Sequence, residues 1–356
     1  MKLHILGAAQ TVTGSQYLLE VNGSRLLLEC GLFQGRRADT YERNRTFSYD
    51  PAGLDAMILS HAHVDHSGRL PMITKNGFTG QIFCSRATAA ATAYLLRDSA
   101  KIQEGDASYL NYKTAKSFLA KVKSGNGKVI SGDDLQAIKA MLKVGDHGLR
   151  SEVIEKLLTE HHLEVVTPLY TMEDVEETLG HFQGIPYNET VTIGKGLTCT
   201  LYDAGHILGP AMSVICYQGD EGPAKTVLYS GDLGRFNKPI IKDPTLDFPE
   251  EHRNIDLLIM ESTYGNRMHE PMQDMKPLLK KVLLDTFDRG GSIIIPAFAY
   301  GRTQELLYFL HELYLAKEVP AMPVWVDSPL ATQITHVFGE HPETYDQQTH
   351  DAFLKR

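Results

Sequence analysis

Residues 60–68 read Ser60-His61-Ala62-His63-Val64-Asp65-His66-Ser67-Gly68. The apolar residues 56–59 precede them and predict a buried strand that ends where this run begins. Imidazole and carboxylate groups released from a strand end into a loop are typical of a metal site. His61 and His63 are two positions apart, so in an extended loop they point to one side and can chelate one ion. Asp65 and His66 follow a bend and can face a second ion.

Two residues much later in the chain add ligands of the same kinds. His206 and Asp232 each follow a predicted strand and are flanked by glycines. Taken alone, a residue in this context is more often part of a turn. Together with the first cluster they complete a site in which His61, His63 and His206 hold one Zn²⁺, Asp65 and His66 hold another, and Asp232 bridges. Nitrogen and oxygen ligands without thiolate suit catalytic zinc with an open position for water.

Composition limits the class of protein. The chain has 356 residues, which favours two domains or one large elaborated domain. Its formal net charge of -9 gives no global attraction to nucleic acid, so such binding needs a local basic patch. Four scattered cysteines without a CxxC pair indicate reduced thiols and a cytoplasmic protein. No apolar run is long enough to predict a membrane span.

The order of predicted elements indicates an α/β protein. Residues from about 86 to 120 have a helical pattern, and those from about 120 to 165 predict an inserted pair of short amphipathic helices. From about 255 onward, apolar strands alternate with helices, with strands expected at 292–295 and 324–326. That alternation favours parallel βαβ units.

The motifs in combination resemble one family. The HxHxDH cluster, the later Gly-His and the Ser-Gly-Asp are similar to the motifs of the metallo-β-lactamase fold. Segments 27–35, 261–265, 296–305 and 327–331 resemble its β-CASP branch, the RNA- and DNA-processing nucleases that include the mRNA 3′-end cleavage factor. The resemblance implies a four-layer αββα core with an inserted α/β β-CASP domain. We expect the core at 1–265, including the helical insertion, and the incomplete start of the β-CASP domain at 266–356.

The resemblance also implies roles for single residues. Glu29 occupies the early acidic motif, where the family commonly has Asp, and could hydrogen-bond a ligand histidine. Asp65 would both ligate zinc and orient the nucleophile. Glu261 would lie at the mouth of the site and orient a further histidine, although a strand-end carboxylate capping a turn is the alternative.

Two residues are weaker candidates for substrate binding. Arg302 follows Gly301 at a predicted helix start, where an arginine and a helix N-terminus can bind phosphate. A surface salt bridge explains Arg302 equally well. Ser328 precedes Pro329, which is equally typical of a helix N-cap with proline at the first helical position.

The family's two C-terminal histidine motifs are expected beyond the β-CASP segments. His336, His341 and His350 do not lie in the Ser-Gly-His or His-Gly-Glu contexts of those motifs. We therefore expect the sequence to be an N-terminal portion of a longer enzyme. It would lack one ligand of the second zinc and the proton donor to the leaving group.

The predicted function is that of a zinc-dependent ribonuclease with two Zn²⁺. It would hydrolyse phosphodiester bonds of single-stranded RNA through a metal-bound hydroxide. Three alternatives remain open: a DNA nuclease of the same branch, a small-molecule metallohydrolase, and a non-catalytic RNA-binding subunit. We expect RNA as the partner, no membrane, and a chain that could form a homodimer.

Overall fold

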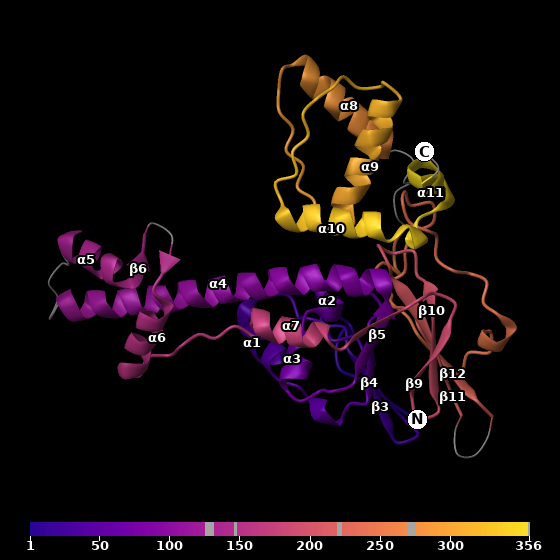
Figure 1. The fold of residues 1–356 in the computed structure, drawn as a ribbon, viewed down its shortest axis with the longest axis horizontal. Coiled ribbons are helices and arrows are strands. Elements are labelled where there is room, and N and C mark those ends of the chain that lie inside the picture. The colour runs from indigo at the N-terminus through magenta and orange to yellow at the C-terminus, as the bar shows by residue number, and fades with distance from the viewer. Residues whose placement is uncertain (125–131, 146–147, 219–222, 269–274, 355–356) are drawn as a thin grey trace. The chain divides into compact units, whose positions relative to one another are not determined.

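The computed structural model describes residues 1–124, 132–145, 148–218, 223–268 and 275–354. The chain divides into two compact units. The larger consists of Met1–Leu96 and Glu177–Arg356, and the smaller of Arg97–Glu176. Figure 1 shows the elements of both units.

The first sheet of the larger unit has six strands in the order β1-β2-β3-β4-β5-β8. They are β1 (Lys2–Ile5), β2 (Tyr17–Val21), β3 (Ser24–Leu28), β4 (Ala56–Ile58), β5 (Gln81–Ser85) and β8 (Phe182–Ile185). β1, β2 and β3 pair antiparallel, whereas β3, β4, β5 and β8 pair parallel. The parallel strands therefore present their carboxyl ends along one edge.

The second sheet has five strands in the order β13-β12-β11-β10-β9. They are β9 (Thr190–Gly194), β10 (Leu197–Asp203), β11 (Ala211–Tyr217), β12 (Lys225–Tyr229) and β13 (Leu257–Ile259). β9 to β12 pair antiparallel and β13 joins β12 in parallel. As a result β10, β12 and β13 run in the same direction and end on the same side.

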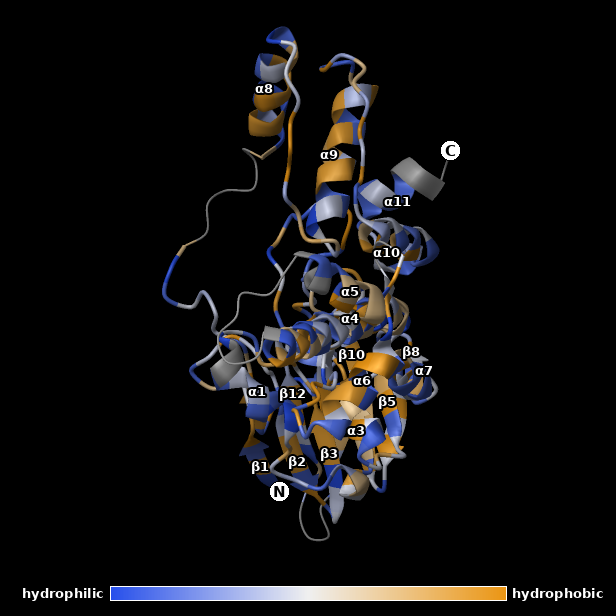
Figure 2. Ribbon diagram, turned by 90° about the vertical axis from the view of Figure 1, so that its left-hand side faces the viewer, coloured by the Kyte–Doolittle hydropathy of each residue, from blue (hydrophilic) through white to orange (hydrophobic). Residues whose placement is uncertain are grey.

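The two sheets pack face to face as a sandwich. Leu26 and Leu28 of β3 belong to the same buried cluster as Leu201 of β10 and Ile215 of β11. Leu27, between the first two, points to the opposite face and is also buried. Figure 2 shows the corresponding hydrophobic colouring of the strands. Burial of both faces explains why β3 reads as a continuous apolar run.

The larger unit also contains helices, several of them in its C-terminal part. They are α1 (Arg37–Arg45), α2 (Val64–Ser67), α3 (Leu70–Lys75), α8 (Met275–Asp288), α9 (Arg302–Leu315), α10 (Pro329–Glu340) and α11 (Gln347–Leu354), with short 3₁₀ turns at Pro51–Gly53, Glu250–His252 and Pro342–Thr344. Leu283 of α8 packs with Leu310 and Leu313 of α9. Ile334 of α10 packs in a cluster with Ala91, which lies in the first turns of α4 (Arg86–Ser124).

The smaller unit is a helical insertion. It contains most of α4, the helices α5 (Gly132–Leu142) and α6 (Ser151–Glu160), the two-residue strands β6 (Lys143–Val144) and β7 (Gly148–Leu149), and the start of α7 (Met172–Leu179). It extends beyond the predicted bounds of 120–165 because α4 continues without a break through the position where the insertion was expected to begin. No helix in the described ranges is both long enough and apolar enough to cross a membrane.

Two predicted strands are wrong. Residues 292–295 and 324–326 have no regular secondary structure and belong to no sheet in the part of the chain that the structure describes. The side chains there are open to solvent: Ile294 is 91% exposed and Trp325 is 87% exposed. The β-forming sequence is present, but there is no neighbouring described strand to complete the hydrogen-bonding ladder.

Candidate metal centre

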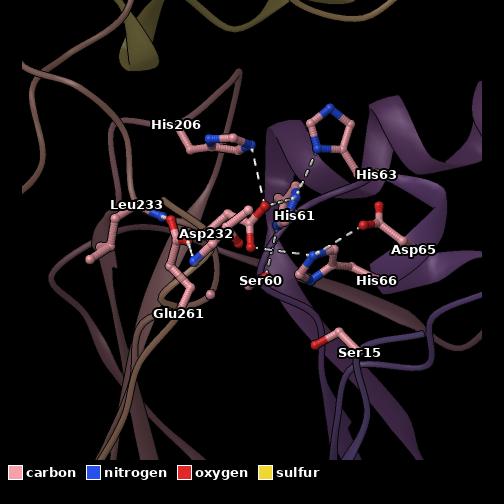
Figure 3. Close-up of polar contacts among 12 residues, drawn as sticks. Ser15, Ser60, His61, His63, Asp65, His66, His206, Asp232, Leu233 and Glu261 are labelled. Carbon is pink, nitrogen blue, oxygen red and sulfur yellow. Dashed lines mark hydrogen bonds and ion pairs between the residues drawn. The ribbon is translucent and has the colours of Figure 1, made fainter. Parts of the chain in front are cut away.

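The carboxyl ends of strands from both sheets deliver the predicted ligands to one place. His61 and His63 follow β4 of the first sheet, whereas His206 follows β10 and Asp232 follows β12 of the second. Figure 3 shows the side chains from the two sheets pointing toward one another. Glu29 follows β3 and belongs to the same end of the sandwich.

Backbone hydrogen bonds from residues early in the chain fix the histidine-rich loop. Ser15 N donates to Asp65 O over 2.9 Å, and Cys30 N donates to His66 O over 2.8 Å. A Cβ atom added to Gly31 would lie 1.7 Å from Asp65 O, so only glycine permits this approach. His63 is the N-cap of the one-turn helix α2, which places Asp65 and His66 after the bend that the sequence predicted.

One set of donor atoms surrounds a common point. An atom from each of His61, His63, His206 and Asp232 lies within 4.8 Å of the others. Nε2 of His61 is 3.0 Å from Nδ1 of His63. Oδ2 of Asp232 is 3.8 Å from Nε2 of His61 and 3.7 Å from Nε2 of His206. Three imidazoles and one carboxylate oxygen are donors of the number and kinds that could hold one metal ion.

The other oxygen of Asp232 faces a second set. Oδ1 of Asp232 is 3.4 Å from Nε2 of His66. Oδ2 of Asp65 is 3.9 Å from the same nitrogen. The carboxylate of Asp232 thus lies between the two sets, with one oxygen toward each.

Glu29 fixes the orientation of His66 through a hydrogen bond to its Nδ1 atom. Its side chain is fully buried and accepts hydrogen bonds from Ser60 N over 2.7 Å and from Nδ1 of His66 over 2.8 Å. Burial raises the pKa of the Glu29 carboxyl. Burial alone would lower the pKa of His66, but the hydrogen bond and charge of Glu29 raise it to about 9. The contact leaves Nε2 of His66 as the nitrogen directed into the site.

The other three imidazoles are in the neutral state in which histidine binds a divalent cation. Burial and the neighbouring histidines hold the pKa of His61 and of His206 well below the ordinary value, and burial lowers the pKa of His63 to about 4. These rings are therefore neutral at pH 7, which is the form that ligates metals. The buried Nε2 atom of His206 has no hydrogen-bond partner in the described part of the chain. A metal ion with nitrogen and oxygen ligands would satisfy it.

Sequence reasoning did not identify three supporting residues. Ser60 Oγ lies 2.9 Å from Nδ1 of His61, Lys238 Nζ donates to His206 O over 2.8 Å, and the ring of Tyr300 packs edge-on against His63 at 5.5 Å between centroids. Ser60 could have been proposed from its place at the strand end. Nothing in the local sequence connects Lys238 or Tyr300 with the histidines.

A cleft of about 270 Å³ opens beside the second set of donors, and Glu261 lines it together with Ser15, His66 and Asp232. The carboxylate of Glu261 accepts from the backbone N–H groups of Leu233 and Thr263, each over 3.1 Å. These hydrogen bonds cap a turn, which was the alternative role that the sequence allowed for Glu261. The same carboxylate also borders the cleft, so Glu261 can cap the turn and line the cleft at once.

The two weaker substrate candidates lie outside the lining of that cleft. Arg302 forms an ion pair with Glu305, with 2.9 Å between Nη1 and Oε2. Ser328 is the N-cap of α10 and accepts a hydrogen bond from Ala331 N over 3.1 Å. Both contacts match the structural interpretations that the sequence allowed, and a substrate role for either residue stays a prediction.

Two family models match different segments of the chain. Residues 10–263 match the family model described as the metallo-beta-lactamase superfamily. Residues 303–355 match the model described as the Beta-Casp domain. The predicted resemblance and fold class are confirmed.

Curated relatives match over nearly the whole chain. Ribonuclease TTHA0252 of Thermus thermophilus is 29% identical over 100% of this chain and 64% of its own length. Transcription termination factor FttA of Methanosarcina mazei is 27% identical over 96% and 44%, and endoribonuclease YSH1 of Kluyveromyces lactis is 25% identical over 100% and 39%. The chain thus spans between about two fifths and two thirds of the length of these relatives.

Proposed function

Because the chain belongs to the metallo-beta-lactamase superfamily and carries a Beta-Casp domain, we propose that it forms the metal-binding part of a ribonuclease. The observation that carries the proposal is the meeting of four histidines and two aspartates from both sheets at one end of the sandwich, beside an open cleft. The names of the relatives, a ribonuclease and an endoribonuclease among them, support RNA as the substrate.

The donor atoms divide between two zinc ions. His61, His63 and His206 would hold one ion, Asp65 and His66 the other, and Asp232 would lie between them. Nitrogen and oxygen donors without cysteine favour zinc in a catalytic rather than a structural site. Bound zinc supplies Lewis acidity toward a phosphate oxygen and toward an attacking water.

The side chains of the chain have distinct tasks around the phosphate. Asp65 is partly open to the site and would hold the proton of the attacking water. Glu29 would orient His66, and Ser60 would orient His61. The cleft bordered by Ser15 and Glu261 has room for the phosphate and part of one nucleotide. We propose single-stranded RNA, because a flexible strand can bend a phosphate into this cleft.

The alternative functions are less well supported. A small-molecule metallohydrolase does not account for the Beta-Casp match. A non-catalytic RNA-binding subunit does not account for all six predicted ligands being present at one site. A DNA nuclease differs only in contacts to the sugar, so the experiment below includes it. A cytoplasmic location is supported by the four free cysteines, and the homodimer stays a prediction.

The test is cleavage of end-labelled single-stranded RNA and DNA of one sequence by the zinc-loaded protein. We expect cleavage of RNA that is abolished by a chelator and by Asp65→Ala, but retained in Asp106→Ala, which removes an exposed carboxylate of α4. Preferential cleavage of DNA would favour the DNA nuclease. Cleavage by Asp65→Ala equal to that by the wild type, or a protein that fails to bind zinc, would contradict the proposal.

A further inference from the structure

The helical unit Arg97–Glu176 carries a groove that the metal centre does not use. Its volume is about 410 Å³, and it is lined by Leu110, Lys113, Thr114, Ser117, Phe118, Lys121 and Leu163. Most of these residues come from α4, and the far wall is Leu163, which follows α6. No acidic side chain is among the lining residues.

The groove lies on the basic part of an acidic chain. Residues 107–124 include four lysines and no Asp or Glu, although the whole chain has a net charge of -9. Lys113 is exposed, and within the described ranges it forms no ion pair. Its ammonium lies 5.8 Å from the ring centroid of Tyr109, which is 56% exposed. Lys113 and Lys121 thus give the lining of the groove a positive charge, as nucleic-acid binding by an acidic protein would require.

The walls of the groove are held in place. The buried side chain of Asn111 bonds both backbone groups of Val166: Nδ2 donates to Val166 O over 2.9 Å, and Val166 N donates to Oδ1 over 2.8 Å. Phe118 packs on the ring of His161 with 4.5 Å between centroids. Leu163 packs against the buried cluster of this unit. These tertiary contacts therefore hold the face of α4 that lines the groove against the segment that contains Leu163.

We propose that this groove binds the backbone of single-stranded RNA. Lys113 and Lys121 are eight residues apart on one helix, about 12 Å along its axis, and would each neutralise a phosphate. The exposed ring of Tyr109, next to Lys113, offers a platform for base stacking, and aromatic rings beside lysines are typical of single-strand binding. The inference rests on the proposed function.

The test measures how RNA affinity depends on salt. A fluorescent 30-nucleotide RNA is titrated with the zinc-loaded Asp65→Ala protein, which prevents cleavage, with and without Lys113→Ala/Lys121→Ala. Each phosphate contact to a single strand contributes about 0.7 to the slope of log K against log salt, so we expect the slope to fall by about 1.4. Lys101→Ala/Lys139→Ala removes two exposed lysines of the same unit outside the groove and should leave the slope nearly unchanged.

A second variant adds a charge without removing a lysine. Ser117→Glu places a carboxylate at an exposed lining position and should weaken RNA binding at least tenfold in low salt. Equal slopes for the two double variants, or unchanged affinity in Ser117→Glu, would overturn the inference. Displacement of the RNA by polyglutamate as readily as by unlabelled RNA would also overturn it, in favour of an acidic protein partner. Cleavage by the wild-type protein tests the proposed function separately.

Discussion

Glu29 accepts a hydrogen bond from Nδ1 of His66 over 2.8 Å, and the same carboxylate accepts from Ser60 N. One buried residue thus anchors the loop at both its first residue and its last histidine. We expect Glu29→Gln to lower zinc affinity 10- to 100-fold, because the amide cannot accept from both groups. Competition with a chromogenic chelator measures the change. Glu20→Gln, on β2 and partly exposed, is the control and should have no effect.

We expect replacement of Gly231 to lower the free energy of unfolding for two separable reasons. Its φ is +55°, and an added Cβ would lie 2.6 Å from the Cβ of Ser60. Gly196 has a similar φ of +66°, but its added Cβ would meet nothing closer than 3.8 Å. Gly196→Ala should therefore lower the free energy of unfolding by about 1 kcal/mol through backbone strain alone. Gly231→Ala should lower it by a further 1–3 kcal/mol, roughly, from the clash. Urea unfolding of both variants checks this, and equal losses would contradict it.

Glu261 can be tested for capping and for catalysis in one series. Glu261→Ala removes the acceptor for two backbone N–H groups and should lower the free energy of unfolding by about 1–3 kcal/mol. Glu261→Gln keeps one acceptor oxygen and should recover about half of that loss. If Glu261 also acts in catalysis, RNA cleavage should stay low in Glu261→Gln despite the recovered stability. Recovery of both together would show that capping is its only role.

Asp203 should give the apo protein a characteristic pH dependence. Burial raises its pKa from 3.8 to about 7, while its side chain accepts from Gly205 N over 2.8 Å. Between these values the folded protein retains a proton that the unfolded chain releases, so stability falls as pH rises from about 4 to about 7. Asp203→Asn keeps an acceptor oxygen and removes the titration.

The measurement is urea unfolding in chelator at pH 5 and pH 8. Relative to the wild type, Asp203→Asn should gain roughly 3 kcal/mol of stability between the two pH values, because two units separate pH 5 from the pKa of about 7 and each is worth 1.36 kcal/mol. Asp256→Asn is the control: nearby groups lower the pKa of the exposed Asp256, so its titration lies below this window. A parallel response of Asp203→Asn and wild type would refute the predicted shift.

The sequence could group the candidate ligands because they follow strands, and the structure brings donor atoms of His61, His63, His206 and Asp232 within 4.8 Å of one another. His206 and Asp232 could be grouped with the HxHxDH loop because parallel strands bring their carboxyl ends to one edge. The supporting contacts could not be predicted in this way. Tyr300 and Lys238 reach the site only through the packing of distant segments, which leaves no local signal.

In the C-terminal region the sequence predicted strands that the structure does not form. Residues 292–295 and 324–326 have the composition of strands, yet a strand exists only where a neighbour completes its hydrogen bonds. Likewise, the local sequence around Arg302 fits a contact with phosphate and an ion pair with Glu305 equally well. Only the structure shows that Arg302 pairs with Glu305.

The division of the candidate ligands between the two sheets would link metal exchange to opening of the sandwich. His61 and His66 follow a strand of one sheet, whereas His206 and Asp232 follow strands of the other, so an ion held by both groups would tie the sheets together. We expect complete release of that ion to need a separation of the two sheets at this end, which would expose buried apolar side chains. We therefore expect zinc to leave with a half-life set by partial unfolding rather than by diffusion out of an open cleft. Radioactive or isotopic zinc exchange, measured across mild urea concentrations, would show that rate rising in step with unfolding.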